Sequence, residues 1–293
     1  MRQCAGAVHT DAVIDPANPD ELARLLRKHH VEPKRSLGQN FLIDAAVRDR
    51  VAEAAGLGSD DETFEVGAGA GALTVALARR CRRVVAVEFD RHLVPVLREV
   101  IGSTASIQVV ESDVMRLDLF DYFPSGGEVV TGNIPYHLTG ALLRKLLETE
   151  PRPRRLALVV QKEVAERWTA TTGASLSTIA VQTLAVPRLA FTIPASAFIP
   201  APKVDSACVV LEVRNQPAVQ VDDLDLFFRL VEAAFQFRRK QLGGTLGRIS
   251  GQGSTTAAAR LRELGIDAQR RPQTLTLPEW EAVYNAFGRR ADG

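Results

Sequence analysis

The order of apolar segments between residues 41 and 161 constrains the fold of this chain more than any other feature. Short apolar runs alternate there with segments in which apolar residues recur at helical spacing. The expected strands are TFEVG (63–67), RRVVAVEFD (82–90), SIQVVESD (106–113), EVVTGN (128–133) and RRLALVVQ (154–161), and the expected helices cover 41–57, 72–81, 92–101 and 140–148. Strands that alternate with helices form a parallel sheet covered on both faces. We therefore expect the α/β class.

The flanking segments extend this pattern. A helix is expected at 19–30, and two further strands, 188–194 and 206–213, have no long helix between them, so we expect them to pair antiparallel. After about residue 214 only helical patterns remain, at 224–249, 255–266 and 277–288. The sequence thus predicts an N-terminal tail at 1–18, an α/β domain at 19–214 and a small all-α domain at 215–293.

Composition excludes several classes of protein. The chain has 293 residues, 46% hydrophobic and 24% charged, as in ordinary globular proteins. Its three cysteines (Cys4, Cys81 and Cys208) form no C-x-x-C pair, which argues against a disulfide framework and a zinc site. The N-terminus lacks the apolar stretch of a signal peptide, and no uncharged apolar run approaches the ~18 residues of a membrane helix. We expect a cytoplasmic protein with no metal site and no membrane partner.

Charge is divided unevenly along the chain. Residues 1–150 carry 17 Lys+Arg and 22 Asp+Glu, a net charge of −5, whereas residues 151–293 carry 19 and 13, a net charge of +6. The excess of basic residues suggests that the second half meets a polyanion. Chance scatter of surface charge explains the division equally well, so composition alone does not decide.

A glycine-rich turn follows the first expected strand. The segment FEVGAGAGALT places Gly67, Gly69 and Gly71 between a strand and a helix, where glycines allow close backbone approach and free amides face an acceptor. Glu88 ends the next strand, 21 residues after Gly67, and can accept both hydroxyls of an adenosine ribose. The pair fits a dinucleotide and S-adenosylmethionine equally well, and a tight turn without a ligand is the remaining alternative.

Two more polar residues occupy the ends of later strands. Asp113 ends the third strand, where it could bind an adenine amino group or cap the following helix. Asn133 ends the fourth strand. In open α/β sheets ligands bind beyond the carboxyl ends of the strands, so these residues are expected to meet Gly67 and Glu88 at one site.

The tetrapeptide NIPY (133–136) suggests what such a site could do with a methyl donor. An adenine N6 amine is a poor nucleophile until its hydrogens are held by two acceptors. Asn133 can offer its side-chain oxygen and Ile134 its main-chain carbonyl, while Pro135 fixes φ and aims that carbonyl. Tyr136 offers a flat face for stacking an extruded base, worth ~1–3 kcal/mol. A plain turn is the alternative interpretation of this tetrapeptide.

Read as a whole, the sequence resembles the ribosomal RNA adenine dimethyltransferases, most closely the KsgA/RsmA type, with the Erm resistance methyltransferases as the nearest cousins. The resemblance runs from about residue 33 to residue 290. It rests on KRSLGQNFLID, EVGAGAGALT, VVAVEFD, ESDV, GNIPYHLTG, VQKEVAERW, FIPAPKVDSA and FQFRRKQL, in that order.

This resemblance implies a class I, Rossmann-like methyltransferase sheet at 19–214 and a helical RNA-recognition domain at 215–293. It also implies dimethylation of N6 of two adjacent adenosines in the 3′-terminal hairpin loop of small-subunit (16S) rRNA during ribosome biogenesis. The implied cofactor is S-adenosyl-L-methionine, the implied partner is the small ribosomal subunit, and the implied oligomeric state is a monomer.

Site residues follow from the resemblance by position. The implied cofactor-binding residues are Asn40, Leu42, Gly67, Gly69, Glu88, Asp113 and Asn133, with Gln39 and Asn40 as a lid segment. The target base is expected between Tyr136 and Phe198. Phosphate contacts are expected from Lys203, Arg238, Arg239 and Lys240, for which a solvated helix face is the alternative.

Two segments depart from the family pattern and bear on substrate recognition. The loop at 169–177 is short and lacks the usual aromatic residue. In the C-terminal region Phe237 stands where a Gln is usual, and Gly243 and Gly244 replace a basic and a polar residue, at a cost of roughly 1 kcal/mol each in a helix interior.

Three alternative functions remain at this stage. An Erm-like enzyme that methylates large-subunit (23S) rRNA would share the same site. A non-catalytic RNA-binding or transcription factor on the same scaffold would have a decayed cofactor site, whereas Gly67, Glu88, Asp113 and Asn133 are all present. A dinucleotide-dependent oxidoreductase would share the glycine turn but gives no reason for NIPY or for the basic helical appendage.

Overall fold

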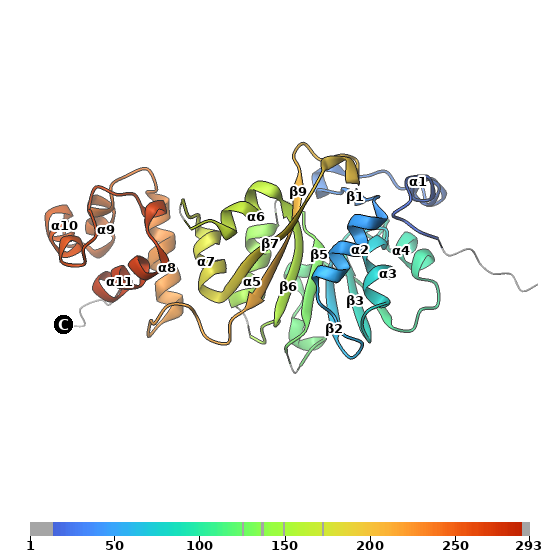
Figure 1. The fold of residues 1–293 in the computed structure, drawn as a ribbon, viewed down its shortest axis with the longest axis horizontal. Coiled ribbons are helices and arrows are strands. Elements are labelled where there is room, and N and C mark those ends of the chain that lie inside the picture. Colours follow the sequence, from blue (N-terminus) through green and yellow to red (C-terminus); the bar gives the residue numbers. More distant parts are fainter. Residues whose placement is uncertain (1–13, 125, 136–137, 149, 172, 289–293) are drawn as a thin grey trace, which may run out of the picture.

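The fold is described from a computed structural model, which defines residues 14–124, 126–135, 138–148, 150–171 and 173–288. Its centre is a seven-stranded sheet in the order β4-β3-β2-β5-β6-β9-β7 (Figure 1). The strands are β2 (Glu62–Val66), β3 (Arg83–Glu88), β4 (Ile107–Glu111), β5 (Val129–Asn133), β6 (Arg155–Gln161), β7 (Ala185–Ile193) and β9 (Ser206–Val213). The first five strands of this order are parallel, and β9 pairs antiparallel with both β6 and β7. The expected α/β class and the antiparallel pair are confirmed.

Helices cover both faces of the sheet because its strands are apolar on both faces. Val85 and Val87 of β3 join a cluster that also holds residues of α5 (Thr139–Glu148), α6 (Lys162–Thr169) and α7 (Leu176–Leu184). Val84 and Ala86 of the same strand join a second cluster, with residues of α2 (Ala45–Ala54), α3 (Ala72–Ala78) and α4 (Val94–Ile101). Adjacent strand residues point to opposite faces, so one strand supplies both cores. No helix within the described residues combines the length and apolar character of a membrane span.

The segment expected as one helix over 41–57 divides into two elements. Phe41 and Leu42 form β1, which pairs antiparallel with β8 (Phe198–Ile199). The helix α2 begins only at Ala45, after Asp44 caps it by accepting a hydrogen bond from the amide of Val47. The prediction of a helix from residue 41 is therefore wrong at its start, because pairing with a distant strand outweighs the local helical pattern.

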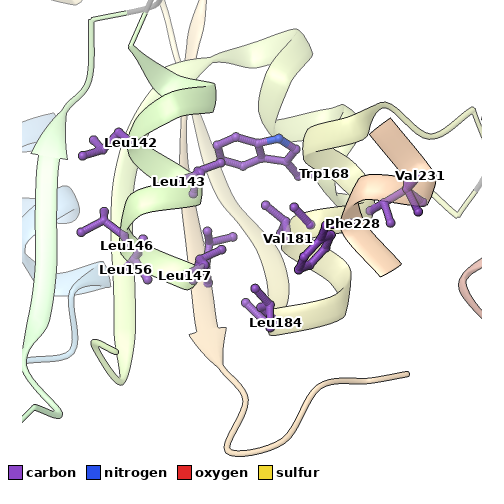
Figure 2. Close-up of a cluster of buried hydrophobic side chains, with 14 of the residues drawn as sticks. Leu142, Leu143, Leu146, Leu147, Leu156, Trp168, Val181, Leu184, Phe228 and Val231 are labelled. Atoms are coloured by element: carbon purple, nitrogen blue, oxygen red, sulfur yellow. The ribbon is translucent and has the colours of Figure 1, made fainter. Parts of the chain in front are cut away.

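Two helices were not expected from the sequence. These helices are α6, which precedes the short loop after residue 169, and α7, which follows it. A capping box between Ser175 and Thr178 starts α7. Its apolar side packs into the cluster drawn in Figure 2, where Val181 and Leu184 lie near Leu147 of α5 and Trp168 of α6.

The C-terminal region is all-helical, as expected, with α8 (Leu224–Gln236), α9 (Leu242–Ser250), α10 (Ser254–Glu263) and α11 (Leu277–Phe287) (Figure 1). The prediction of one helix over 224–249 is wrong, because the chain turns between α8 and α9. Gly243 and Gly244 consequently lie in the first turn of α9 rather than in a helix interior. A Cβ on Gly243 would lie 3.2 Å from the Cβ of Ala268, so close packing favours glycine there.

At the N-terminus, α1 (Pro19–Lys28) lies against α4. Its Leu22 and Leu25 join Leu93 of the segment before α4 in a third apolar cluster. Pro16 and Ala17, which the sequence placed in the N-terminal tail, are buried, Ala17 with only 2% of its surface exposed, while residues 1–13 lie outside the described residues.

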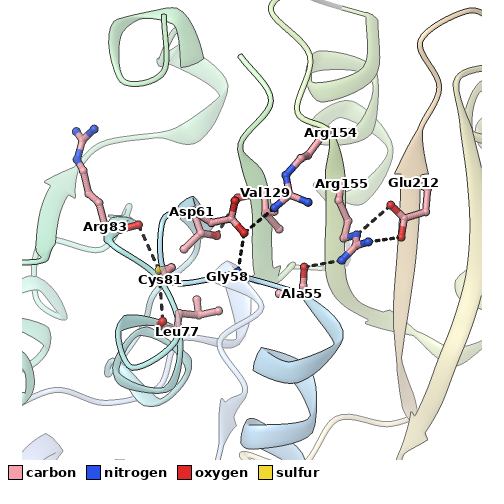
Figure 3. Close-up of polar contacts among 11 residues, drawn as sticks. Ala55, Gly58, Asp61, Leu77, Cys81, Arg83, Val129, Arg154, Arg155 and Glu212 are labelled. Carbon is pink, nitrogen blue, oxygen red and sulfur yellow. Dashed lines mark hydrogen bonds and ion pairs between the residues drawn. The ribbon is translucent and has the colours of Figure 1, made fainter. Parts of the chain in front are cut away.

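Ion pairs lie at the end of the sheet where the parallel strands begin (Figure 3). Arg154 donates to Asp61 at 2.8 Å, and the same Asp61 carboxylate accepts the amide of Gly58 at 2.6 Å. Arg155 contacts both carboxylate oxygens of Glu212 at 2.9 Å and also donates to the carbonyl of Ala55. These contacts tie the loop after α2 to β6 and β9.

Candidate functional site

A cavity of about 260 Å³ lies at the carboxyl ends of β2, β3 and β5. It brings together most of the residues that the sequence singled out, although they come from distant parts of the chain. The predicted residues that line it are Gln39, Asn40, Leu42, Gly67, Gly69, Glu88, Asp113, Asn133, Pro135 and Phe198. Ile134 is 1% exposed and is not among the lining residues, and Tyr136 lies outside the described residues.

The glycine turn is shaped by backbone that other residues rarely adopt. Gly67 and Gly69 have φ of 71° and 57°, in the left-handed region that favours glycine. The amide of Gly69 donates to Glu88 Oε2 at 2.7 Å, and the amide of Asp90 donates to Glu88 Oε1 at 2.8 Å. The turn and the acid that follows β3 are therefore one hydrogen-bonded unit.

Glu88 is buried at the cavity wall, with 6% of its surface exposed. Burial raises the pKa of its carboxyl, and the amide donors from Asp90 and Gly69 oppose that shift. Each oxygen has accepted one amide and keeps capacity for another donor. Such a carboxylate can receive the two hydroxyls of a ribose.

The position of Asp113 is compatible with both of its predicted roles. One carboxylate oxygen caps the short helical turn Val114–Arg116 by accepting the amide of Met115 at 2.9 Å. Its side chain is 33% exposed and also lines the cavity. The capping role is observed, and contact with a base remains a prediction.

Glu65 is a functional candidate that the sequence reasoning missed. This residue of β2 lines the cavity, is 1% exposed, and its Oε2 has no hydrogen-bond partner among the described residues. Burial raises the pKa of its carboxyl to about 8, the nearby Thr74 hydroxyl opposes that shift, and the charge of Glu88 adds to it. The available signal was an acid between the apolar residues Phe64 and Val66, two residues before Gly67.

The side chain of Asn133 is held in one orientation. Its amide nitrogen donates to the main-chain carbonyl of Asn40 at 2.8 Å, which leaves the amide oxygen as the atom able to accept a further donor. The amide of Ile134 donates to Val159 at 3.0 Å, and no described residue donates to the Ile134 carbonyl. The Asn133 oxygen is thus an acceptor at the cavity, and the role of the Ile134 carbonyl as a second acceptor remains a prediction.

Phe41, Phe89 and Phe198 supply the aromatic surface of the cavity. Phe198 is 2% exposed and is paired with Leu42 across β1 and β8, so its position is set by backbone hydrogen bonding. Phe89 also lines the cavity but is 60% exposed, and the sequence reasoning did not single it out. An exposed phenyl ring at the rim of a polar site is available to a ring-shaped ligand.

The four basic residues predicted to contact phosphate do not line the cavity. Lys203 is exposed between β8 and β9, and Arg238, Arg239 and Lys240 are exposed in the turn between α8 and α9. Their role remains a prediction. Among the described residues no group of three His, Cys, Asp or Glu side chains is placed to hold a metal ion.

Comparison with known proteins gives a consistent result. A family model described as ribosomal RNA adenine dimethylase matches residues 31–286. The ribosomal RNA small subunit methyltransferase A of Pelotomaculum thermopropionicum is 39% identical, with 92% of this chain and 97% of the relative covered. The protein of the same name from Bacillus mycoides is 37% identical, with 93% and 97% covered.

Two solved structures illustrate the similarity of the fold. The 23S rRNA methyltransferase ErmE has a TM-score of 0.68 and 28% identity, covering 85% of this chain and 100% of its own. A dimethyladenosine transferase from Plasmodium falciparum has a TM-score of 0.68 and 24% identity, covering 83% and 96%. The second likeness shows the fold alone.

Proposed function

The chain belongs to the ribosomal RNA adenine dimethylase family, and on that premise we propose that it dimethylates N6 of two adjacent adenosines in the 3′-terminal hairpin loop of small-subunit (16S) rRNA. The methyl donor is S-adenosylmethionine. Relatives named as small-subunit methyltransferases support this substrate, since they match at 36–39% identity over 97–98% of their own length. The expected partner is the small ribosomal subunit, met by a monomer.

One observation carries the proposal. The oriented amide of Asn133, fixed by a 2.8 Å hydrogen bond to Asn40, shares a single cavity with the buried carboxylate of Glu88. A ribose-binding acid and an acceptor for an amino group are what a reaction between an adenosine-containing donor and an adenine amine requires. A dinucleotide oxidoreductase would use the acid but has no need of the amide.

The cavity fits S-adenosylmethionine. Glu65 offers a buried carboxylate oxygen with no hydrogen-bond partner among the described residues, and a cationic ligand in the cavity would supply one. We propose that Glu88 and Asp113 hold the adenosine part, and that Gly67, Gly69, Asn40 and Leu42 line the remainder. When bound, the sulfonium group supplies a methyl group that is ready for transfer.

The protein's part in the reaction is to prepare the adenine amine. The Asn133 oxygen and the Ile134 carbonyl accept the two N6 hydrogens and draw the nitrogen toward tetrahedral geometry, which localises its lone pair. Pro135 keeps this acceptor pair rigid through its fixed φ. Phe198 presents its ring to the base, with Tyr136 as the proposed second face. Positioning and electrostatic complementarity supply most of the rate enhancement, so no strong base is needed.

Methylation of large-subunit rRNA is the second candidate, because the ErmE structure matches 85% of this chain. Its identity of 28% is lower than that of the relatives named for the small subunit, so we rank it second. A non-catalytic role is disfavoured by the intact cavity.

Labelled S-adenosylmethionine tests the proposal directly. Undermethylated small subunits and protein-free 23S rRNA are offered in parallel, and the modified adenosines are mapped. Label in two adjacent adenosines of the 3′ hairpin supports the proposal. Asn133→Ala should strongly reduce this labelling. Label confined to 23S rRNA transfers the enzyme to the second candidate, and no label in either RNA contradicts both.

A further inference from the structure

Residues 34–40 run along the wall of the cavity as a strap. Leu37, Gly38, Gln39 and Asn40 all line the cavity. Downstream the strap continues into β1, whose Phe41 and Leu42 pair with β8. Its last residue, Asn40, provides the carbonyl that orients the Asn133 amide.

A single carboxylate holds the other part of this strap. Asp90, 4% exposed, accepts hydrogen bonds from Lys34 Nζ at 2.9 and 3.0 Å and from Gln39 Nε2 at 2.9 Å. The Gln39 oxygen in turn accepts the amide of Lys34 at 2.7 Å. Burial alone would raise the pKa of Asp90, but the donors from Lys34, Gln39 and the amide of His92 outweigh it and lower that pKa. The Asp90 carboxylate is therefore stabilised in its charged form by these donors.

Apart from the bond between Asn133 and the Asn40 carbonyl, the other hydrogen bonds of the strap among the described residues are internal. They run from the Leu37 and Gln39 amides to the Lys34 carbonyl and from the Asn40 side chain to Gly38. Among the described side chains, every hydrogen bond from residues 34–39 to another part of the chain ends on Asp90. Asp90 also donates its amide to Glu88. One residue thus connects the acid at the cofactor end of the cavity with the strap that reaches Asn133.

We propose that Asp90 is a positioning residue for methyl transfer: by holding Lys34 and Gln39 it sets the strap, so that the Asn40 carbonyl keeps the Asn133 amide aimed at the adenine amine. The inference rests on the proposed function for its catalytic consequence, but the geometry it describes exists without substrate. A misplacement of about 1 Å in a positioned group can cost ~100-fold in rate. Loss of the anchor should therefore lower kcat more than it weakens cofactor binding.

Reversing the hydrogen bond between positions 90 and 39 separates positioning from general damage. Asp90→Asn removes the anionic acceptor, and its amide can no longer accept from Gln39 through nitrogen. Gln39→Glu places two carboxylates face to face. The double variant restores one donor and one acceptor with opposite direction, and the carboxylate introduced at position 39 can still accept the Lys34 amide. We expect each single variant to lose about tenfold or more in kcat, with the KM for S-adenosylmethionine within about threefold, and the double variant to recover most of the loss.

Lys34→Met has a matched control in Lys28→Met. Lys28 also pairs with a carboxylate at 2.8 Å, that of Glu99, but it lies on α1 with 64% of its side chain exposed. Only the Lys34 variant should lower kcat. Equal effects of the two variants, or single variants at positions 90 and 39 with unchanged kcat, would overturn the proposal.

The orientation of Asn133 can be followed without any turnover. The chain has five asparagines, so selective ¹⁵N labelling gives few side-chain amide signals, and Asn133→Asp identifies the one that matters. Gln39→Met should move this signal toward the position and exchange rate of an exposed asparagine amide. An unchanged signal would contradict the strap mechanism. If the signal moves while the wild-type enzyme methylates neither RNA, the strap stands and the proposed function fails.

Discussion

The two ends of the central sheet use polar residues in opposite ways. At the amino ends of the parallel strands two ion pairs join Asp61 with Arg154 and Arg155 with Glu212, the last of which lies near the carboxyl end of the antiparallel β9 (Figure 3). At the carboxyl ends Glu65 is buried without a partner for Oε2 among the described residues. The polar groups at the amino ends of the parallel strands are therefore paired and contribute to stability. Those at the carboxyl ends can still bind a ligand.

Glu128 is an exception to this division. It lies at the amino end of β5, is 5% exposed, and neither carboxylate oxygen has a hydrogen-bond partner among the described residues. Burial raises the pKa of this carboxyl as well. An unpaired acid alone therefore does not mark a binding site, and what distinguishes Glu65 is its place on the cavity wall.

The largest expected effect on methyl transfer comes from a substitution at the carboxyl ends of the strands. Asn133→Ala should lower single-turnover methyl transfer by about 100- to 1000-fold, because one oriented acceptor of the transition state is lost. The cost in folding should be limited to one hydrogen bond, about 1 kcal/mol. Rapid-quench assays with thermal unfolding of the same samples measure both. A rate within tenfold of wild type would remove Asn133 from the mechanism.

Removal of the unpaired acid should act on binding. Glu65→Gln is expected to weaken S-adenosylmethionine by about 10- to 100-fold, as is typical for loss of a hydrogen bond to a charged group. Calorimetry of the ligand-free and titrated protein gives affinity and stability together. The ligand-free variant should not be less stable at pH 8, where the wild-type carboxyl begins to ionise. Glu128→Gln serves as the control and should leave affinity unchanged.

The pH dependence of binding sharpens the same point. With a pKa of about 8, Glu65 is mostly protonated near neutrality and must release a proton to face a cation. Affinity for S-adenosylmethionine should therefore rise about tenfold between pH 6 and pH 7 and level off near pH 8. In the absence of ligand the sign is opposite: the folded protein is favoured below the ordinary pKa of 4.5 and loses stability as pH rises toward 8.

Two comparisons isolate that proton. Glu65→Gln should bind with a flat profile, and so should 5′-methylthioadenosine, which lacks the amino acid part of the cofactor. Titrations in buffers of different ionisation enthalpy count the released proton. Equal pH profiles for wild type and variant would assign the dependence to another group.

The smallest effect is expected from a substitution at the amino ends of the parallel strands, and it concerns stability. Asp61→Asn removes one ion pair and weakens a hydrogen bond from Gly58, at a cost of about 1 kcal/mol in the free energy of unfolding. The hydrogen bond from Gly58 and the Arg154 pair lower the pKa of Asp61, so its contribution is present above pH 4 and lost as pH falls below it. Urea unfolding at pH 7 and pH 3 tests this. Methyl-transfer kinetics should not change, and a change would mean that contacts at the amino ends of the strands affect the site at their carboxyl ends.

Local patterns explain most of what the sequence predicted correctly. Apolar runs and helical spacing are set by neighbouring residues, so the parallel strands and the ends that carry Glu88, Asp113 and Asn133 were predictable. The β1–β8 pair was not, because two residues carry no periodicity and their partner lies far along the chain. The break at Phe237 depends on carbonyls of Ala268 and Arg270, which the local pattern cannot show.

The site itself was predictable only in its parts. Glycines and polar strand ends have recognisable signatures, whereas the role of Asp90 depends on Lys34 and Gln39, which approach it from a separate segment. The importance of Glu65 could not be predicted from the sequence for a similar reason. What distinguishes this buried acid is its place on the cavity wall, which depends on segments far away in the sequence.

The pairing of Phe41 with Ile199 has a consequence for how the protein folds. It joins the two ends of the α/β domain, so the cavity wall cannot form until nearly all of that domain has been synthesised and collapsed. Contacts of such high sequence separation are made late, after their loop-closure entropy has been compensated by local structure. Competence to bind a ligand should therefore appear in one step at the end of folding, and a newly made chain gains it only when its α/β domain is complete.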